Sequence, residues 1–257
     1  MPKISLKSKF FSKKSFILIL ITTFLIICLL VANFLSAFLI KTESKTENVS
    51  SNSFDIYMLT LAKSQVEKEA ESLASDYQQI GAGGYIWKND DYFYVVSSAY
   101  INKNDAVLVQ NSVKANQGLD SEIITVNFKS STINGNFTGE EKKVLTKALN
   151  SFCDYYLKIY DIAISLDTAV YNEISARLAI NSVHNNLNNI IDDYNTLFKD
   201  VDDDGLKSLG NCLNKALNAS KLLCGGTPIS KDQTYSSILK YRYLEVLSLY
   251  YDFINDL

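Results

Sequence analysis

The sequence predicts an α+β protein built from three consecutive parts. The first observation is an uncharged, apolar run over 16–40. The second is that alternating, strand-like segments and helical segments follow one another over 54–130. The third is that only helical periodicity is found over 136–257. We therefore expect an N-terminal transmembrane helix, then a mixed sandwich, then an all-α helical bundle.

The first forty residues have the composition of a membrane anchor. Residues 1–15 carry five lysines and no acidic residue, and 16–40 has no charged side chain. About 20 apolar residues suffice to cross a bilayer, and lysine clusters stay on the cytoplasmic side. We expect a cytoplasmic Lys-rich tail, a single transmembrane helix in the cell membrane, and extracytoplasmic C-terminal parts. A cleaved secretory signal, with Leu35, Ser36 and Ala37 at the cleavage site, is the alternative.

The segment 41–53 is polar, lacks aromatic residues and has no aliphatic pattern, so a linker is expected there. The whole chain has a formal net charge of −3. Because the first forty residues contribute only lysines, the remainder is more acidic than that value. An acidic surface repels phosphate backbones, so nucleic acid is not expected as a partner.

Strand and helix patterns alternate over 54–130. Aromatic and β-branched residues at alternate positions predict strands, and apolar residues three and four apart predict helices. Glycines at 81–84 and at Gly118 end the two helices. The expected order is strand, helix, strand, strand, helix, strand, with strands at 54–62, 85–88, 92–100 and 121–128 and helices at 64–80 and 104–118. This order is typical of a ferredoxin/RNP-like βαββαβ sandwich, with both helices on one face of the sheet.

Four amphipathic helices are expected over 136–257, enough for a small bundle. Thr138 and Glu141 form a capping-box pattern before the first helix, and Ser230 and Gln233 repeat it before the fourth. The second and third helices are expected over 167–199 and 206–224.

Few residues in the chain suggest catalysis. His184 is the only histidine, and no nucleophile elbow, phosphate loop or zinc-protease helix is present. We expect His184 to be an ordinary helix residue, and we expect a protein that is not an enzyme and needs no cofactor. Asp200 to Gly205 matches the start of a calcium loop, but Asn211 stands where a bidentate glutamate would close it. The alternative is that these acids cap the next helix.

Two strand segments carry a resemblance to a known family. The first reads YMLTLAKS from Tyr57 to Ser64, and the second reads FYVVSSAY from Phe93 to Tyr100, followed by INKNDA. Together with the order of elements, they make 54–128 similar to a SPOR domain, a module of bacterial division and sporulation proteins. The resemblance implies binding to the glycan strands of peptidoglycan in the cell envelope. Thr60 and Ala62 stand where the family usually has Gln and Gly.

Alternation along 92–100 predicts which side chains share a face. Phe93, Val95 and Ala99 are expected to point toward the helices, leaving Tyr92, Tyr94, Val96 and Ser98 on the open face. Flat aromatic rings with a polar tip suit the apolar faces of sugar rings.

We expect Tyr92 and Tyr94, with Thr60 and Lys63 on the neighbouring strand, to form the glycan-binding site. The alternative is that the C-terminal bundle covers this face and the tyrosines are packing residues. The expected function is therefore that of a glycan-binding protein with a protein partner at the bundle. The rival hypothesis is a structural or signalling ectodomain that acts through protein–protein contacts.

Overall fold

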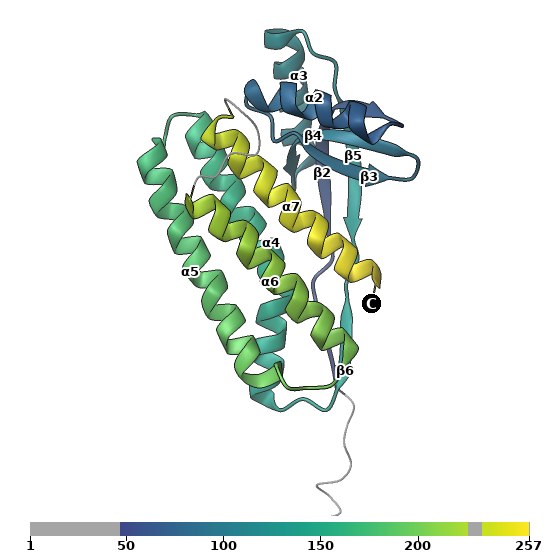
Figure 1. The fold of residues 1–257 in the computed structure, drawn as a ribbon, viewed down its shortest axis with the longest axis vertical. Coiled ribbons are helices and arrows are strands. Elements are labelled where there is room, and N and C mark those ends of the chain that lie inside the picture. Colours follow the sequence, from purple (N-terminus) through teal and green to yellow (C-terminus); the bar gives the residue numbers. More distant parts are fainter. Residues whose placement is uncertain (1–46, 226–232, 257) are drawn as a thin grey trace, which may run out of the picture. The chain divides into compact units, whose positions relative to one another are not determined.

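The structure is a computed structural model that describes residues 47–225 and 233–256. From Glu47 onward the chain forms one compact unit. The described part holds six helices and six strands. A four-stranded sheet carries two helices on one face. A bundle of four longer helices packs against the other face through its first and last helices (Figure 1).

The sheet has the strand order β3–β4–β2–β5 with every pair antiparallel. The predicted alternation of strands and helices over 54–130 is confirmed. The bounds are β2 (Phe54–Ser64), α2 (Glu67–Gln79), β3 (Tyr85–Asn89), β4 (Tyr92–Tyr100), α3 (Lys103–Gln117) and β5 (Glu122–Phe128). Gly118 ends α3 with a φ of 68°, the left-handed conformation that glycine adopts without strain.

The helices of the bundle are α4 (Gly139–Asp167), α5 (Glu173–Phe198), α6 (Asp204–Gly225) and α7 (Tyr235–Asp256). The capping box before α4 is present: the Thr138 backbone N–H donates to Glu141 Oε2 at 2.7 Å, and the Glu141 N–H donates to Thr138 Oγ1 at 3.2 Å. The cap predicted at Ser230 lies outside the described residues. At α7 the Ser237 N–H donates to Thr234 Oγ1 at 3.1 Å.

A two-stranded ribbon joins the two parts of the fold. It pairs β1 (Glu47–Ser50) with β6 (Thr132–Gly135) and packs against α4. Part of the expected linker, 41–53, is thus a strand, and residues 41–46 lie outside the described residues. The two parts also share one hydrophobic core.

Two irregularities in the β2–β4 pairing change which face each residue occupies. The register skips Ser97 on β4 and Leu61 on β2. Val95 therefore packs with α2, whereas Ala99 joins the core on the bundle side. The predicted positions of Ala99 on the helix side and of Ser98 on the open face are wrong, because a bulge adds one residue and reverses the alternation beyond it.

Helix α7 crosses the face of the sheet for which the sequence allowed two interpretations. One was an exposed binding face, and the other was a face covered by the bundle. Trp87 of β3 packs edge-on against Tyr251 at 5.2 Å between ring centroids. Phe128 of β5 and Phe152 of α4 both stack with Tyr250, at 6.1 and 4.6 Å. Most of this face is therefore interior, and its aromatic side chains hold the sheet to the bundle.

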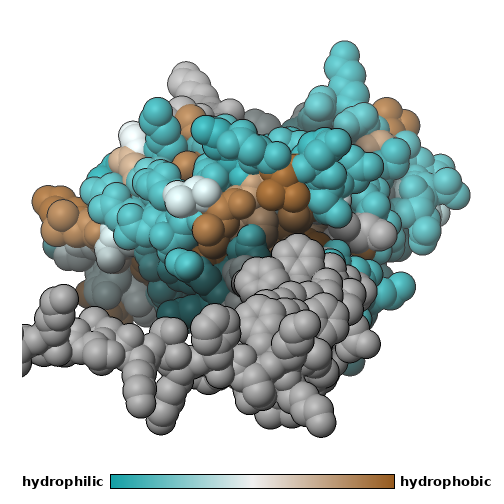
Figure 2. Space-filling model, turned by 90° about the horizontal axis from the view of Figure 1, so that it is seen from below, coloured by the Kyte–Doolittle hydropathy of each residue, from teal (hydrophilic) through white to brown (hydrophobic). Residues whose placement is uncertain are grey.

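The end of the molecule shown in Figure 2 is largely polar. Seen from the end of the bundle where α5 meets α6, most of the visible surface is hydrophilic, and apolar side chains come to the surface in a few separate places (Figure 2). Scattered apolar patches of this kind are normal on a folded protein.

The membrane part of the predicted fold class needs correction. The predicted tail at 1–15 and transmembrane helix at 16–40 lie outside the described residues. Within 47–225 and 233–256, no helix combines the length and the apolar character that spanning a membrane requires. The longest, α4, has 29 residues but carries lysines and acids along its length. For the part of the chain that the structure describes, the fold class with a membrane helix and the single-pass membrane localisation are wrong.

Candidate functional site

Three of the four residues predicted to bind glycan lie together at one end of the sheet. Tyr92 and Tyr94 are on β4 with their ring centroids 6.2 Å apart and tilted by 56°. Lys63 on β2 is the register partner of Tyr94, so the two side chains share a face. Glu122, at the start of β5, joins them through an ion pair with Lys63. We call Lys63, Tyr92, Tyr94 and Glu122 the rim cluster.

Lys63 is held between a ring and a carboxylate. Its Nζ lies 5.5 Å from the centroid of the Tyr92 ring and 3.5 Å from Glu122 Oε2. The lysine and glutamate side chains are 51% and 56% exposed. Water screens such exposed pairs, so they add little stability. Their effect is to orient a donor and an acceptor beside an aromatic ring.

Thr60, the fourth predicted residue, is close to the rim cluster but buried. Its hydroxyl donates to the Glu122 carbonyl oxygen at 3.1 Å and so fixes the start of β5. A shallow pocket of about 260 Å³ lies beside it, lined by 60–63 and 120–122. Thr60 therefore holds the backbone of Glu122 in place from the interior of the protein. Glu122 was not predicted as a site residue, because only the β2–β5 register places it opposite Thr60.

The row of aromatic side chains runs from solvent into the core. Tyr92 is 36% exposed, Tyr94 is half-buried against the core, and Trp87, the register partner of Tyr94, is buried. The rim cluster is thus the uncovered end of a sheet face that α7 otherwise occupies.

His184 makes a single polar contact within the described chain. Its Nδ1 lies 3.1 Å from Ser220 Oγ on α6, and Ser220 is fully buried. Burial, with a smaller effect of nearby Lys221, lowers the pKa of His184 below its usual 6.5. Because substrate has no access to Ser220, this pair gives no nucleophilic site.

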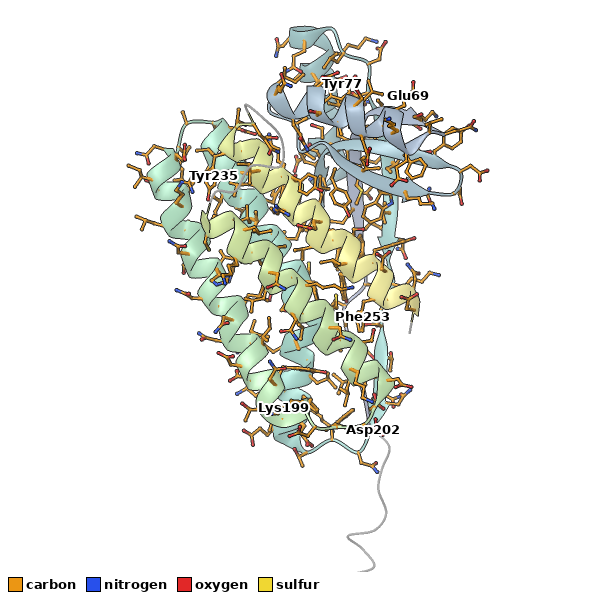
Figure 3. All side chains as sticks on the ribbon, viewed as in Figure 1. Glu69, Tyr77, Lys199, Asp202, Tyr235 and Phe253 are labelled. Carbon is orange, nitrogen blue, oxygen red and sulfur yellow. The ribbon has the colours of Figure 1, made fainter. Side chains whose placement is uncertain are left out.

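The acidic segment Asp200 to Gly205 joins α5 to α6 at the lower end of the bundle, where Figure 3 labels Lys199 and Asp202. Asp203 Oδ1 accepts a hydrogen bond from the Leu206 N–H at 2.9 Å, as a helix cap does. Asp202 pairs with Lys207, and this hydrogen bond lowers the pKa of Asp202. In the described ranges, no three His, Cys, Asp or Glu side chains are grouped as a metal site would require.

No family model, no curated protein and no solved structure matches this chain. The resemblance to a SPOR domain thus stays an expectation from the sequence.

Proposed function

We propose that this protein is a non-catalytic glycan-binding protein whose rim cluster contacts saccharide strands such as those of peptidoglycan. The observation that carries the proposal is the grouping of Tyr92 and Tyr94 with Lys63 and Glu122 at the uncovered end of the sheet. An aromatic ring stacks on the apolar C–H face of a sugar, and an ammonium group and a carboxylate beside it form hydrogen bonds with the sugar hydroxyls.

The geometry indicates how a sugar would bind. The Lys63 ammonium lies over one face of the Tyr92 ring, so a sugar stacks on the remaining exposed surface of the tyrosine pair. Lys63 then donates to a sugar oxygen, and Glu122 accepts from a sugar hydroxyl.

A site made of one tilted tyrosine pair accommodates one or two sugar rings. Its affinity for a short oligosaccharide is therefore expected to be low. A polymer offers many copies of the same unit close together, so retention on an insoluble glycan is expected to be much stronger than binding to a single unit.

The proposal is tested by co-sedimentation of the full chain with purified peptidoglycan sacculi. Tyr92→Ala should lower the sedimented fraction. Tyr171→Ala is the matched control, because Tyr171 is also 36% exposed but lies at the turn between α4 and α5. If the parent chain does not sediment with sacculi, or if both variants lose binding equally, the proposal fails.

A second candidate function is contact with a protein partner through the bundle. Ile174 and Leu178 lie four residues apart at the start of α5 and are 72% and 67% exposed, and Val170, in the turn that precedes the helix, is 72% exposed. Such a stripe suits the apolar face of a partner helix. Leu178→Lys should abolish a complex that forms through this stripe, as measured by analytical ultracentrifugation.

A further inference from the structure

A sizeable cavity lies away from the rim cluster. It has a volume of about 510 Å³ and lies where α3, α4 and the turn between α2 and β3 meet. From this cavity we infer a second binding site, which takes a neutral, hydroxyl-rich ring compound of mono- or disaccharide size. The site does not depend on the rim cluster or on the function proposed for it.

The lining of the cavity combines two kinds of side chain. Aliphatic groups come from β2, α3 and α4, and hydroxyl groups come from β4 and α4. Ser98 Oγ and Tyr100 Oη are 2.7 Å apart, and the Tyr160 ring lies edge-on to that of Tyr100 at 5.8 Å. A pyranose ring combines the same two kinds of group, in its apolar C–H faces and its hydroxyl-bearing edge. The aliphatic lining is Leu61, Val109, Val113 and Ile164, and the hydroxyl lining includes Ser97, Ser98, Tyr100 and Tyr160.

The charges in the cavity favour a neutral ligand. The Lys240 ammonium lies 2.6 Å from Asp167 Oδ2 and donates to the Gly81 carbonyl oxygen at 3.0 Å. Its side chain is 13% exposed and that of Asp167 is 37% exposed. Because the two charges already compensate each other, neither an anion nor a cation gains a partner of opposite charge.

A hydroxyl group fits this ion pair better than any charged group. An ammonium has three N–H donors, and the contacts to Asp167 and Gly81 use two, leaving one for a ligand. A hydroxyl accepts from that donor and can donate to the Asp167 carboxylate at the same time. Adjacent hydroxyls on one ring, as in a sugar, make both contacts without disturbing the ion pair.

The size of the cavity also fits a small ligand. Its volume is within the range of roughly 300 to 1,000 Å³ found for small-molecule sites. The turn at its edge is held in place: Ser237 Oγ donates to the Ala82 carbonyl oxygen, and Gly83 N donates to the Ser97 carbonyl oxygen at 2.8 Å. The site is thus formed before a ligand arrives.

The test is isothermal titration calorimetry of the full chain with glucose, N-acetylglucosamine and chitobiose, and with decanoate as an anionic amphiphile. We expect saturable binding of at least one saccharide and none of decanoate. Ser112 lines the cavity and is exposed on α3, so Ser112→Trp blocks the entrance without disturbing the core, and it should weaken saccharide binding about tenfold. Asn111→Trp adds the same bulk at the exposed neighbouring position outside the lining and should change binding less than about twofold.

Three results overturn the inference: no saturable binding of any of the three saccharides, tighter binding of decanoate, or equal losses from Ser112→Trp and Asn111→Trp. Tyr92→Ala separates this site from the rim cluster. This variant should bind the saccharides as the parent does in the titrations. If it loses saccharide binding, the saccharide binds at the rim cluster, and the cavity site is overturned. If the saccharides bind while the parent chain fails to sediment with sacculi, the function proposed for the rim cluster fails and the cavity site stands.

Discussion

The hydroxyl of Tyr156 on α4 donates to the backbone carbonyl oxygen of Ala99 on β4 at 2.8 Å. On the same side, the Ala99 N–H donates a hydrogen bond to Tyr243 Oη of α7 at 3.2 Å. Strand β3 pairs with β4 only as far as Val96, so the backbone of Ala99 lies beyond its partner strand. Two tyrosines of the bundle thus take the place of a missing strand, because a buried backbone group without a partner is costly.

Replacing Tyr156 by Phe should destabilise the protein by about 1–3 kcal/mol, because the buried Ala99 carbonyl loses its donor. Tyr171→Phe is the control, since the Tyr171 hydroxyl belongs to a side chain that is 36% exposed at the turn between α4 and α5. Its removal should cost little. Urea unfolding curves of the two variants give the comparison, and equal losses of stability would show that the Ala99 bond contributes nothing.

Lys63→Met should weaken retention on sacculi with little change in melting temperature, because Lys63 is half-exposed and its ion pair is screened by water. Lys88→Met provides the control: Lys88 also lies over an aromatic ring, that of Phe93 at 5.7 Å, but outside the rim cluster. Sedimentation at low and high salt measures the effect. If the two variants bind alike, Lys63 makes no contact with the glycan.

Acidification should lower stability partly through His184. Its pKa in the folded protein is below its usual 6.5, so the unfolded chain binds more protons than the folded chain below that pH. The contribution is therefore fully present above about pH 6.5 and is lost as the pH falls through the folded pKa. Thermal melts of the parent and of His184→Gln at about pH 7 and about pH 5 should show a smaller pH effect in the variant. An unchanged pH effect would mean that His184 does not contribute.

Alkaline conditions should loosen the junction of sheet and bundle. Burial raises the pKa values of Tyr85 and Tyr100 from the usual 10 to about 12. The contribution of these neutral phenols is complete below about pH 10 and is lost as the pH rises toward 12. Tyrosinate absorbance should rise together with the loss of circular dichroism. A rise that is complete before any loss of structure would contradict this expectation.

The sequence was sufficient for features that depend on neighbouring residues. The order of elements over 54–130 follows from local periodicity, and the capping box of Thr138 and Glu141 depends on residues three apart. The strand β1 was missed because its partner β6 is more than 80 residues away, and four residues carry no clear pattern of their own. The bulge at Ser97 was missed for a related reason: it is defined by pairing with β2.

In the candidate site too, features set by neighbouring residues were predicted, and features set by the pairing of distant strands were not. Alternation on one strand correctly placed Tyr92 and Tyr94 on one face, because no irregularity separates them. Thr60 was expected on the surface, but the neighbouring strand β5 buries it. Glu122 has no sequence signal of its own, since only the pairing of β2 with β5 brings it to Lys63.

The covering of the sheet by α7 has a consequence for synthesis of the protein. During translation, the strands that carry Ile56 and Phe128 leave the ribosome well before α7, whose Tyr250 completes the cover over Phe128. Until then, a nascent chain with a formed sheet presents an uncovered apolar face, the kind of surface that chaperones bind and that promotes aggregation. Ribosome-bound chains arrested before Tyr235 should therefore be captured by chaperones, and chains that have extruded α7 should be released.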